Sequence, residues 1–176
     1  MDLLDRLSEE GRVRLGETAE RLAMATRDEN RAGSLALVRQ ARHSLRIISR
    51  ELDGPLYANA PFVDAVSAIA RRGRHSTIRI LITNSDPIVH HGHLLIELAR
   101  RLSSTIQIRR LGEEVRDFNQ AFLVVDEIGV LHRPQSELYD ATLNFNDPGQ
   151  AKVLAGRFEE LWERSAPDPE LRRLHV

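Results

Sequence analysis

Three histidines, His90, His91 and His93, form the densest cluster of titratable side chains in the sequence. They follow Thr77–Thr83, a β-branched stretch typical of a buried strand, and open α/β sheets usually bind ligands beyond the carboxyl ends of their strands. Neutral imidazole is a good zinc ligand, but adjacent side chains diverge on a helix or strand, and no partner ligand is identifiable. We therefore expect no metal and favour surface imidazoles at a helix start, with one histidine facing a phosphate as the alternative.

A second set of polar side chains surrounds the apolar segment 120–126, which is expected to be a strand. Asn119 precedes this segment, Asp126 ends it, and His132 and Arg133 lie at the end of the next expected strand. Arginine binds phosphate through two parallel hydrogen bonds and does not lose its charge. We hypothesise that these four residues, with a histidine of 90–93, form a polar pocket that binds an anion without cleaving it.

The competing interpretation of the same residues is structural. Arg133 would then form a surface ion pair with Glu127 or Glu137, a kind of contact that contributes little to stability. An aspartate that ends a strand shortly before a glycine, as Asp126 does before Gly129, is often a turn former. The sequence favours this structural interpretation of Arg133 over the anion pocket.

Composition narrows the classes of function. The 176 residues suffice for one domain with a hydrophobic core, and the absence of cysteine excludes disulfides, thiolate metal sites and cysteine nucleophiles. No apolar run approaches the ~20 residues of a membrane helix. The start of the chain lacks the basic residues and the apolar core of a secretory signal. We therefore expect a cytoplasmic protein with no membrane span and no cofactor.

The charge pattern bears on nucleic acids as partners. The net charge is −1, so binding of a polyanion would require a local patch. Basic residues cluster at 71–75, 100–101 and 109–110, and arginines at helix C-termini complement the helix dipole, which accounts for the first two groups. Only 5% of the residues are aromatic, and we expect them in the core rather than stacked on bases. The sequence thus weighs against nucleic acid as a partner.

The hydrophobic pattern predicts helices that alternate with strands. Ser34 is expected to cap the first regular helix and Pro61 to begin the second, while Asp147 and Pro148 mark the start of the last. The last helix is expected to bury the stripe Val153, Leu154, Phe158, Leu161 and Trp162. Strands are expected at 44–50, 77–83, 105–109, 120–126 and 129–132.

This order of elements predicts an α/β fold with a mixed, partly parallel sheet flanked by helices on both faces. The regular pattern covers residues 34–165, which we expect to form one domain. Residues 1–33 are expected to be an N-terminal arm or junction segment, and residues 166–176 a polar C-terminal tail.

Two local patterns resemble one half of a phospholipase D-like domain. The first is Phe122-Leu-Val-Val-Asp126, followed by a turn and Val130-Leu131. The second is Asn144-Phe-Asn-Asp-Pro148, followed by a helix that closes on Leu161-Trp162. The resemblance covers 34–165 and implies the half-domain fold of this superfamily. Single halves in the superfamily often pair about a two-fold axis, so a homodimer is expected.

The sequence departs from the superfamily at its catalytic strand, which reads His-x-Lys, four residues, then Asp. With Asp126 as the aspartate, Asn119 stands at the histidine and Ala121 at the lysine. In the family, histidines attack phosphorus and protonate the leaving group, and lysines hold the phosphoryl oxygens. An asparagine amide neither attacks phosphorus nor protonates a leaving group. Alanine carries no charge that could hold the phosphoryl oxygens. Lys152 is the only lysine, so no other alignment restores the motif.

The resemblance therefore predicts a catalytically inactive phospholipase D-like domain that acts as an interaction, dimerisation or anion-binding module. A phosphate-containing ligand and a role accessory to another enzyme domain fit this prediction. Two alternatives stay open. One is a phosphodiesterase-type hydrolase with an altered site that uses His90, His91 or His93, and the other is a nucleic-acid-binding regulator that uses the arginine pairs.

Overall fold

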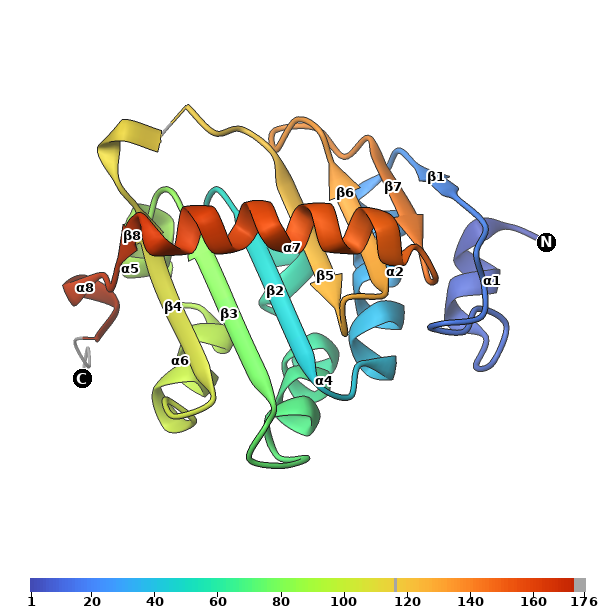
Figure 1. The fold of residues 1–176 in the computed structure, drawn as a ribbon, viewed down its shortest axis with the longest axis horizontal. Coiled ribbons are helices and arrows are strands. Elements are labelled where there is room, and N and C mark those ends of the chain that lie inside the picture. The colour runs from blue at the N-terminus through green and yellow to red at the C-terminus, as the bar shows by residue number, and fades with distance from the viewer. Residues whose placement is uncertain (116, 173–176) are drawn as a thin grey trace.

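A mixed sheet of eight strands forms the middle layer of the computed structural model, which describes residues 1–115 and 117–172 (Figure 1). Its spatial order is β1-β7-β6-β5-β2-β3-β4-β8. The strands β2, β3 and β4 are parallel neighbours, and the other neighbours pair antiparallel. In chain order they are β1 (Leu22–Met24), β2 (Ser44–Ser49), β3 (Thr77–Ile82), β4 (Ile106–Leu111), β5 (Ala121–Val125), β6 (Gly129–Arg133), β7 (Ala141–Asn144) and β8 (Ser165–Ala166).

Helices cover both faces of this sheet (Figure 1). The long helix α7 crosses one face, and α2, α4 and α6 lie on the other. The helices are α1 (Leu3–Ser8), α2 (Arg27–Gln40), α3 (Gly54–Tyr57), α4 (Ala60–Ala70), α5 (Asp86–His91), α6 (Leu94–Arg101), α7 (Pro148–Glu163) and α8 (Pro169–Arg172), with a 3-10 turn at Glu113–Val115. The predicted fold class, a mixed sheet between two helical layers, is confirmed. No helix among the described residues is long and apolar enough to cross a membrane.

The core has two parts, one on each face of the sheet, because successive strand side chains point to opposite faces. On the α7 side, Phe122 and Val124 pack with Phe158 and Trp162. Leu123 belongs to the larger cluster under α2, α4 and α6. The strand β5 is therefore buried along its whole length and fixes the positions of the residues at its two ends.

The first long helix begins earlier than the sequence pattern suggested. Thr26 caps α2 in a capping box with Glu29, whose side chain reaches back to the Thr26 amide. Ser34, expected as the cap, is buried inside the helix instead. Gly33 also lies inside this helix. A Cβ at this position would come within 2.9 Å of the Leu143 side chain, which leaves room for glycine but not for a larger residue. The glycine thus permits a close approach of α2 to β7.

Segments outside 34–165 contribute to the same sheet and core. β1 pairs with β7, and β8 pairs with β4. Leu7, Val13 and Leu171 are buried in the larger cluster. Of the expected polar tail, residues 173–176 lie outside the described part of the chain. The prediction of a buried α7 stripe was wrong for one residue. Val153 is 70% exposed, because it lies on the side of the helix away from the sheet.

Candidate functional site

The carboxyl ends of β2 and β3 and the start of β5 meet at one edge of the sheet, since β5 runs antiparallel to β2. A cavity of about 570 Å³ opens there, which we call the upper cavity. Of the predicted pocket residues, Asn119 and Arg133 both contribute to its lining. Their polar neighbours in the lining include Arg50, Asp53, Ser136 and Glu137.

The Arg133 side chain is directed into the protein. It is 3% exposed, its Nε donates to the Leu138 carbonyl oxygen (2.9 Å), and its Nη2 donates to the Ser136 carbonyl oxygen. Its Nη1 lies 3.7 Å from Asp53 Oδ2, and the guanidinium lies over the Tyr139 ring. Arg133 thus holds the 134–139 segment in place. Within the described residues, Arg133 does not form the expected surface ion pair with Glu127 or Glu137. Its guanidinium is bound to protein groups and does not face an open anion site.

Asn119 is fixed by two side chains of the same segment. Its amide nitrogen donates to Glu137 Oε2 (2.8 Å), and its Oδ1 accepts from the Ser136 hydroxyl (2.7 Å). The hydrogen bond from Asn119 lowers the pKa of Glu137. Ala121 is 1% exposed at the start of β5, with no polar atom in its side chain. Among the described residues, the lining of the upper cavity therefore offers hydrogen bonds but contains no imidazole or ammonium group.

Asp126 lies at the opposite end of β5 from Asn119. Its carboxylate accepts hydrogen bonds from the backbone amides of Arg42 (2.8 Å), His43 (2.7 Å) and Ser44 (2.9 Å). Its backbone φ of +53° and that of Glu127 (+55°) are those of a tight hairpin turn. Asp126 thus anchors the connection from α2 to β2 and cannot share a pocket with Asn119. The hypothesis that these residues form one pocket was wrong on this point.

His90 and His91 lie exposed at the end of α5, whereas His93 is buried between α5 and α6. His93 caps α6: its Nδ1 accepts from the Leu95 amide (3.1 Å) and its Nε2 donates to the Leu52 carbonyl oxygen (3.0 Å). Leu52 itself has a φ of +56°, which costs energy for a non-glycine residue. The described residues contain no group of three metal-ligating side chains.

His132 points to the other face of β6 from Arg133, as neighbouring strand residues do. Its Nε2 lies 2.9 Å from Gln120 Oε1, and its ring lies near that of Phe122. Burial, and then the positive charge of Arg21, lower its pKa. His132 therefore does not belong to the upper cavity.

Buried His93 makes stability depend on pH. Burial lowers its folded-state pKa below the unfolded value, so the unfolded chain binds the proton first as pH falls through about 6.5. Stability is therefore full above that pH and is lost below it. We expect urea midpoints to fall between pH 7.5 and 5.5, and to fall less in His93→Asn, which keeps a capping oxygen but cannot titrate. An equal fall in both proteins would contradict this assignment.

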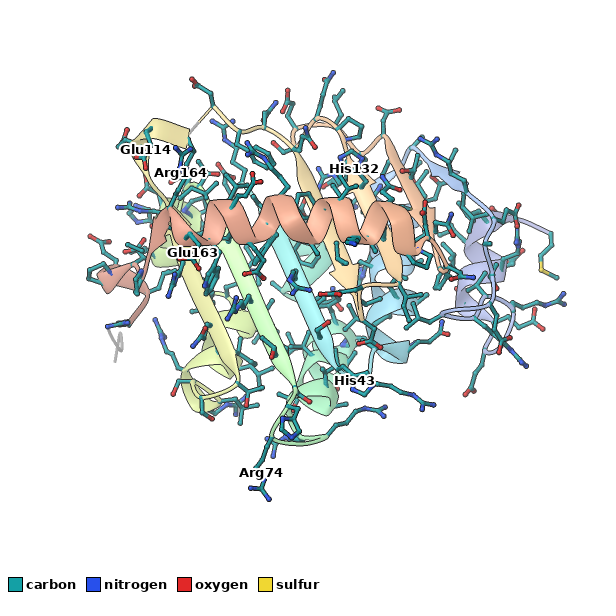
Figure 2. All side chains as sticks on the ribbon, in the orientation of Figure 1. His43, Arg74, Glu114, His132, Glu163 and Arg164 are labelled. Carbon is teal, nitrogen blue, oxygen red and sulfur yellow. The ribbon has the colours of Figure 1, made fainter. Side chains whose placement is uncertain are left out.

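A second cavity, of about 420 Å³, lies at the Asp126 end of the sheet. Arg39 and Arg42 at the end of α2 and Arg72 after α4 contribute to its lining, together with His43. Arg74 and His75 follow in the next turn, and Figure 2 shows Arg74 and His43 at this same end of the molecule. We call this group, Arg39, Arg42, His43, Arg72, Arg74 and His75, the arginine pole. The sequence pattern missed the contribution of α2, because only the packing of α2 on α4 joins the two groups.

A family described as a domain of unknown function, DUF7931, matches residues 26–174. The chain belongs to this family. No curated protein matches the DUF7931 chain by sequence.

The DUF7931 chain is similar in fold to several solved structures. TrmBL2, an archaeal chromatin protein with a novel mode of DNA binding, matches with a TM-score of 0.63 and 16% identity over 84% of this chain, which spans only 53% of TrmBL2. Nuc, a phospholipase D family member from Salmonella typhimurium, matches with a TM-score of 0.59 and 16% identity over 85% of this chain and 99% of Nuc. NucT from Helicobacter pylori matches with a TM-score of 0.56 and 12% identity over 85% of this chain and 99% of NucT. The predicted phospholipase D-like fold is thereby confirmed.

Proposed function

We propose that this DUF7931 chain is a catalytically inactive phospholipase D-like domain that binds the phosphate backbone of nucleic acid at its arginine pole. The proposal has two parts, loss of cleavage and retention of anion binding. The first is supported by Asn119 and Ala121, which stand where the superfamily motif has histidine and lysine. The second is supported by the convergence of arginines from α2 and from the segment after α4.

The arginine pole is the observation that carries the binding part. The side chains of Arg39, Arg42, Arg72 and Arg74 are exposed and make no ion pair within 1–115 and 117–172. Asp126 is the acidic residue in the cavity lining, and three backbone amides already share its charge. Positive charge without a local partner is what attracts a phosphate backbone.

The upper cavity is less suited to an anion. Its lining includes the carboxylates Glu51, Asp53 and Glu137, and Arg133 is already bound to protein groups. Anion binding is therefore proposed at the other end of the sheet. TrmBL2, which shares the fold, is a DNA-binding chromatin protein, and this agrees with nucleic acid as the partner.

Reversing the charge of two pole residues should remove most of the binding. With about three to four phosphate contacts, the logarithm of affinity for duplex DNA should fall with the logarithm of salt concentration with a slope near −3. Arg39→Glu with Arg72→Glu should reduce this slope by about two and weaken binding at least tenfold. Fluorescence anisotropy of a labelled duplex at several salt concentrations measures both quantities.

The matched control is Arg21→Glu with Arg31→Glu, which makes the same charge change at exposed arginines elsewhere on the domain. It should bind DNA nearly as the parent does. Equal loss in both double variants would mean that net charge, and not the pole, governs binding. Binding to anionic vesicles without binding to DNA would also contradict the proposal.

The hydrolase alternative has less support. His93 is occupied in capping α6, and His90 and His91 are exposed at the end of a short helix with no hydrogen-bonded base or acid beside them among the described residues. The homodimer stays a prediction, which light scattering would test. The domain boundaries at 34 and 165 also stay predictions, which limited proteolysis would test.

A further inference from the structure

The outer edge of β4 is only partly covered by a neighbouring strand. β8 pairs with β4 only at Arg110 and Leu111, which leaves 106–109 without a strand on that side in the described chain. The Ile78 amide donates to the Thr105 carbonyl oxygen (3.2 Å). The N–H and C=O groups of successive residues point to opposite sides of a strand. Since those of residue 105 face β3, those of residues 106 and 108 point away from β3. The N–H and C=O of residue 108 are therefore open for pairing.

A groove follows this open edge. It is a cavity of about 710 Å³ between α6, β4 and the β8–α8 segment, and we call it the β4 groove. Its apolar residues come from all three elements: Ile96, Ala99, Ile106, Ile108 and Leu171. An exposed edge beside an apolar groove is the arrangement that accepts an added strand.

The charged residues of the β4 groove indicate which kind of partner it would bind. Arg101 and Arg172 are exposed at its rim, and Arg109 also contributes to the lining. The acidic lining residue is Asp168, whose side chain is 2% exposed and whose Oδ2 lies 3.8 Å from Arg110 Nε. This Oδ2 is buried without a hydrogen-bond donor. The groove therefore combines a positive rim with one buried acceptor that lacks a donor.

We infer that the β4 groove binds an extended acidic segment of a partner protein, which adds a strand to β4. A peptide backbone supplies alternating N–H and C=O groups for residue 108 and an N–H donor for Asp168. An acyl chain supplies neither, although it would fit the apolar residues. Side chains of an added strand alternate between the faces of the sheet. One set would pack beside Ile106 and Ile108. The other set, the carboxylates, would lie on the same face as Arg109, whose Nη1 already donates to the Trp162 carbonyl oxygen (3.1 Å) and whose guanidinium lies over the Trp162 ring.

A fluorescein-labelled octapeptide of alternating valine and glutamate is a suitable probe for the 176-residue chain. Anisotropy should rise with protein concentration for this peptide and stay flat for the same peptide with lysine in place of glutamate. Arg101→Glu with Arg172→Glu should weaken binding about tenfold or more, whereas Arg21→Glu with Arg31→Glu should leave it unchanged. Both changes are at exposed positions, so folding should be preserved.

A second readout tests strand addition itself. Hydrogen exchange of the Ile108 amide should slow when the acidic peptide binds, because that N–H gains an acceptor. Equal binding of acidic and basic peptides, or no binding of either, would overturn the inference. It would also be overturned by displacement of the peptide with laurate, or by binding that appears only after removal of residues 173–176, since the groove would then have another occupant. DNA binding at the arginine pole is independent of each of these results.

Discussion

Replacing Asp126 by alanine is expected to lower the free energy of unfolding by about 2–4 kcal/mol, because three backbone amides lose one shared acceptor. These amides lie where α2 connects to the start of β2, a strand inside the sheet that pairs with β3 on one side and with β5 on the other. The backbone of Asp126 is also left-handed, a conformation that alanine adopts less readily than aspartate. The single tryptophan, Trp162, is buried against the sheet, so its fluorescence reports unfolding in urea.

Asp126→Asn should lose less stability than Asp126→Ala, since asparagine keeps one acceptor and tolerates a left-handed backbone. Asp140→Ala is the matched control, because Asp140 is exposed and should change the unfolding free energy by no more than about 0.5 kcal/mol. If Asp126→Ala were as stable as this control, Asp126 would be an ordinary surface turn residue and its anchoring role would be refuted.

Arg133→Ala should have the second large effect, a loss of about 3–5 kcal/mol in unfolding free energy. The substitution leaves the partly buried Asp53 carboxylate without its cation, and the carbonyl oxygens of Ser136 and Leu138 without their donor. Tyr139 also loses the guanidinium that lies over its ring. The same urea titration measures the loss.

Arg50→Ala provides the comparison within the same cavity. Arg50 is exposed, and its removal should change stability by no more than about 0.5 kcal/mol. If Arg133→Ala were equally mild, and the parent bound phosphate in the upper cavity, the anion-pocket hypothesis for Arg133 would have to be restored.

Most of the central fold could be predicted from the sequence because its signals are local. The alternation of β-branched residues in β3 and the cap and proline at the start of α7 each act within a few residues. β1, β7 and β8 were missed because strands of two to four residues leave too little pattern. The start of α2 was misplaced because serine is a common cap residue, whereas Ser34 lies inside a helix that Thr26 and Glu29 already cap.

The site was harder to predict, although one part could have been excluded in advance. Seven residues of extended chain span about 23 Å, so Asn119 and Asp126 on one strand cannot share a small pocket. The burial of Arg133 could not be foreseen, because it depends on how 134–139 folds back over β6. Likewise, Arg39 and Arg72 meet only through packing of α2 on α4, which no local pattern records.

The central claim is that this domain holds nucleic acid without cleaving it. The most direct measurement incubates an end-labelled DNA duplex with the parent protein, follows its retention in a native gel, and then examines the recovered DNA under denaturing conditions. We predict that the duplex is retained at low salt, released as salt rises, and recovered at full length. Shortened DNA, or a duplex that is not retained even at low salt, would contradict the claim.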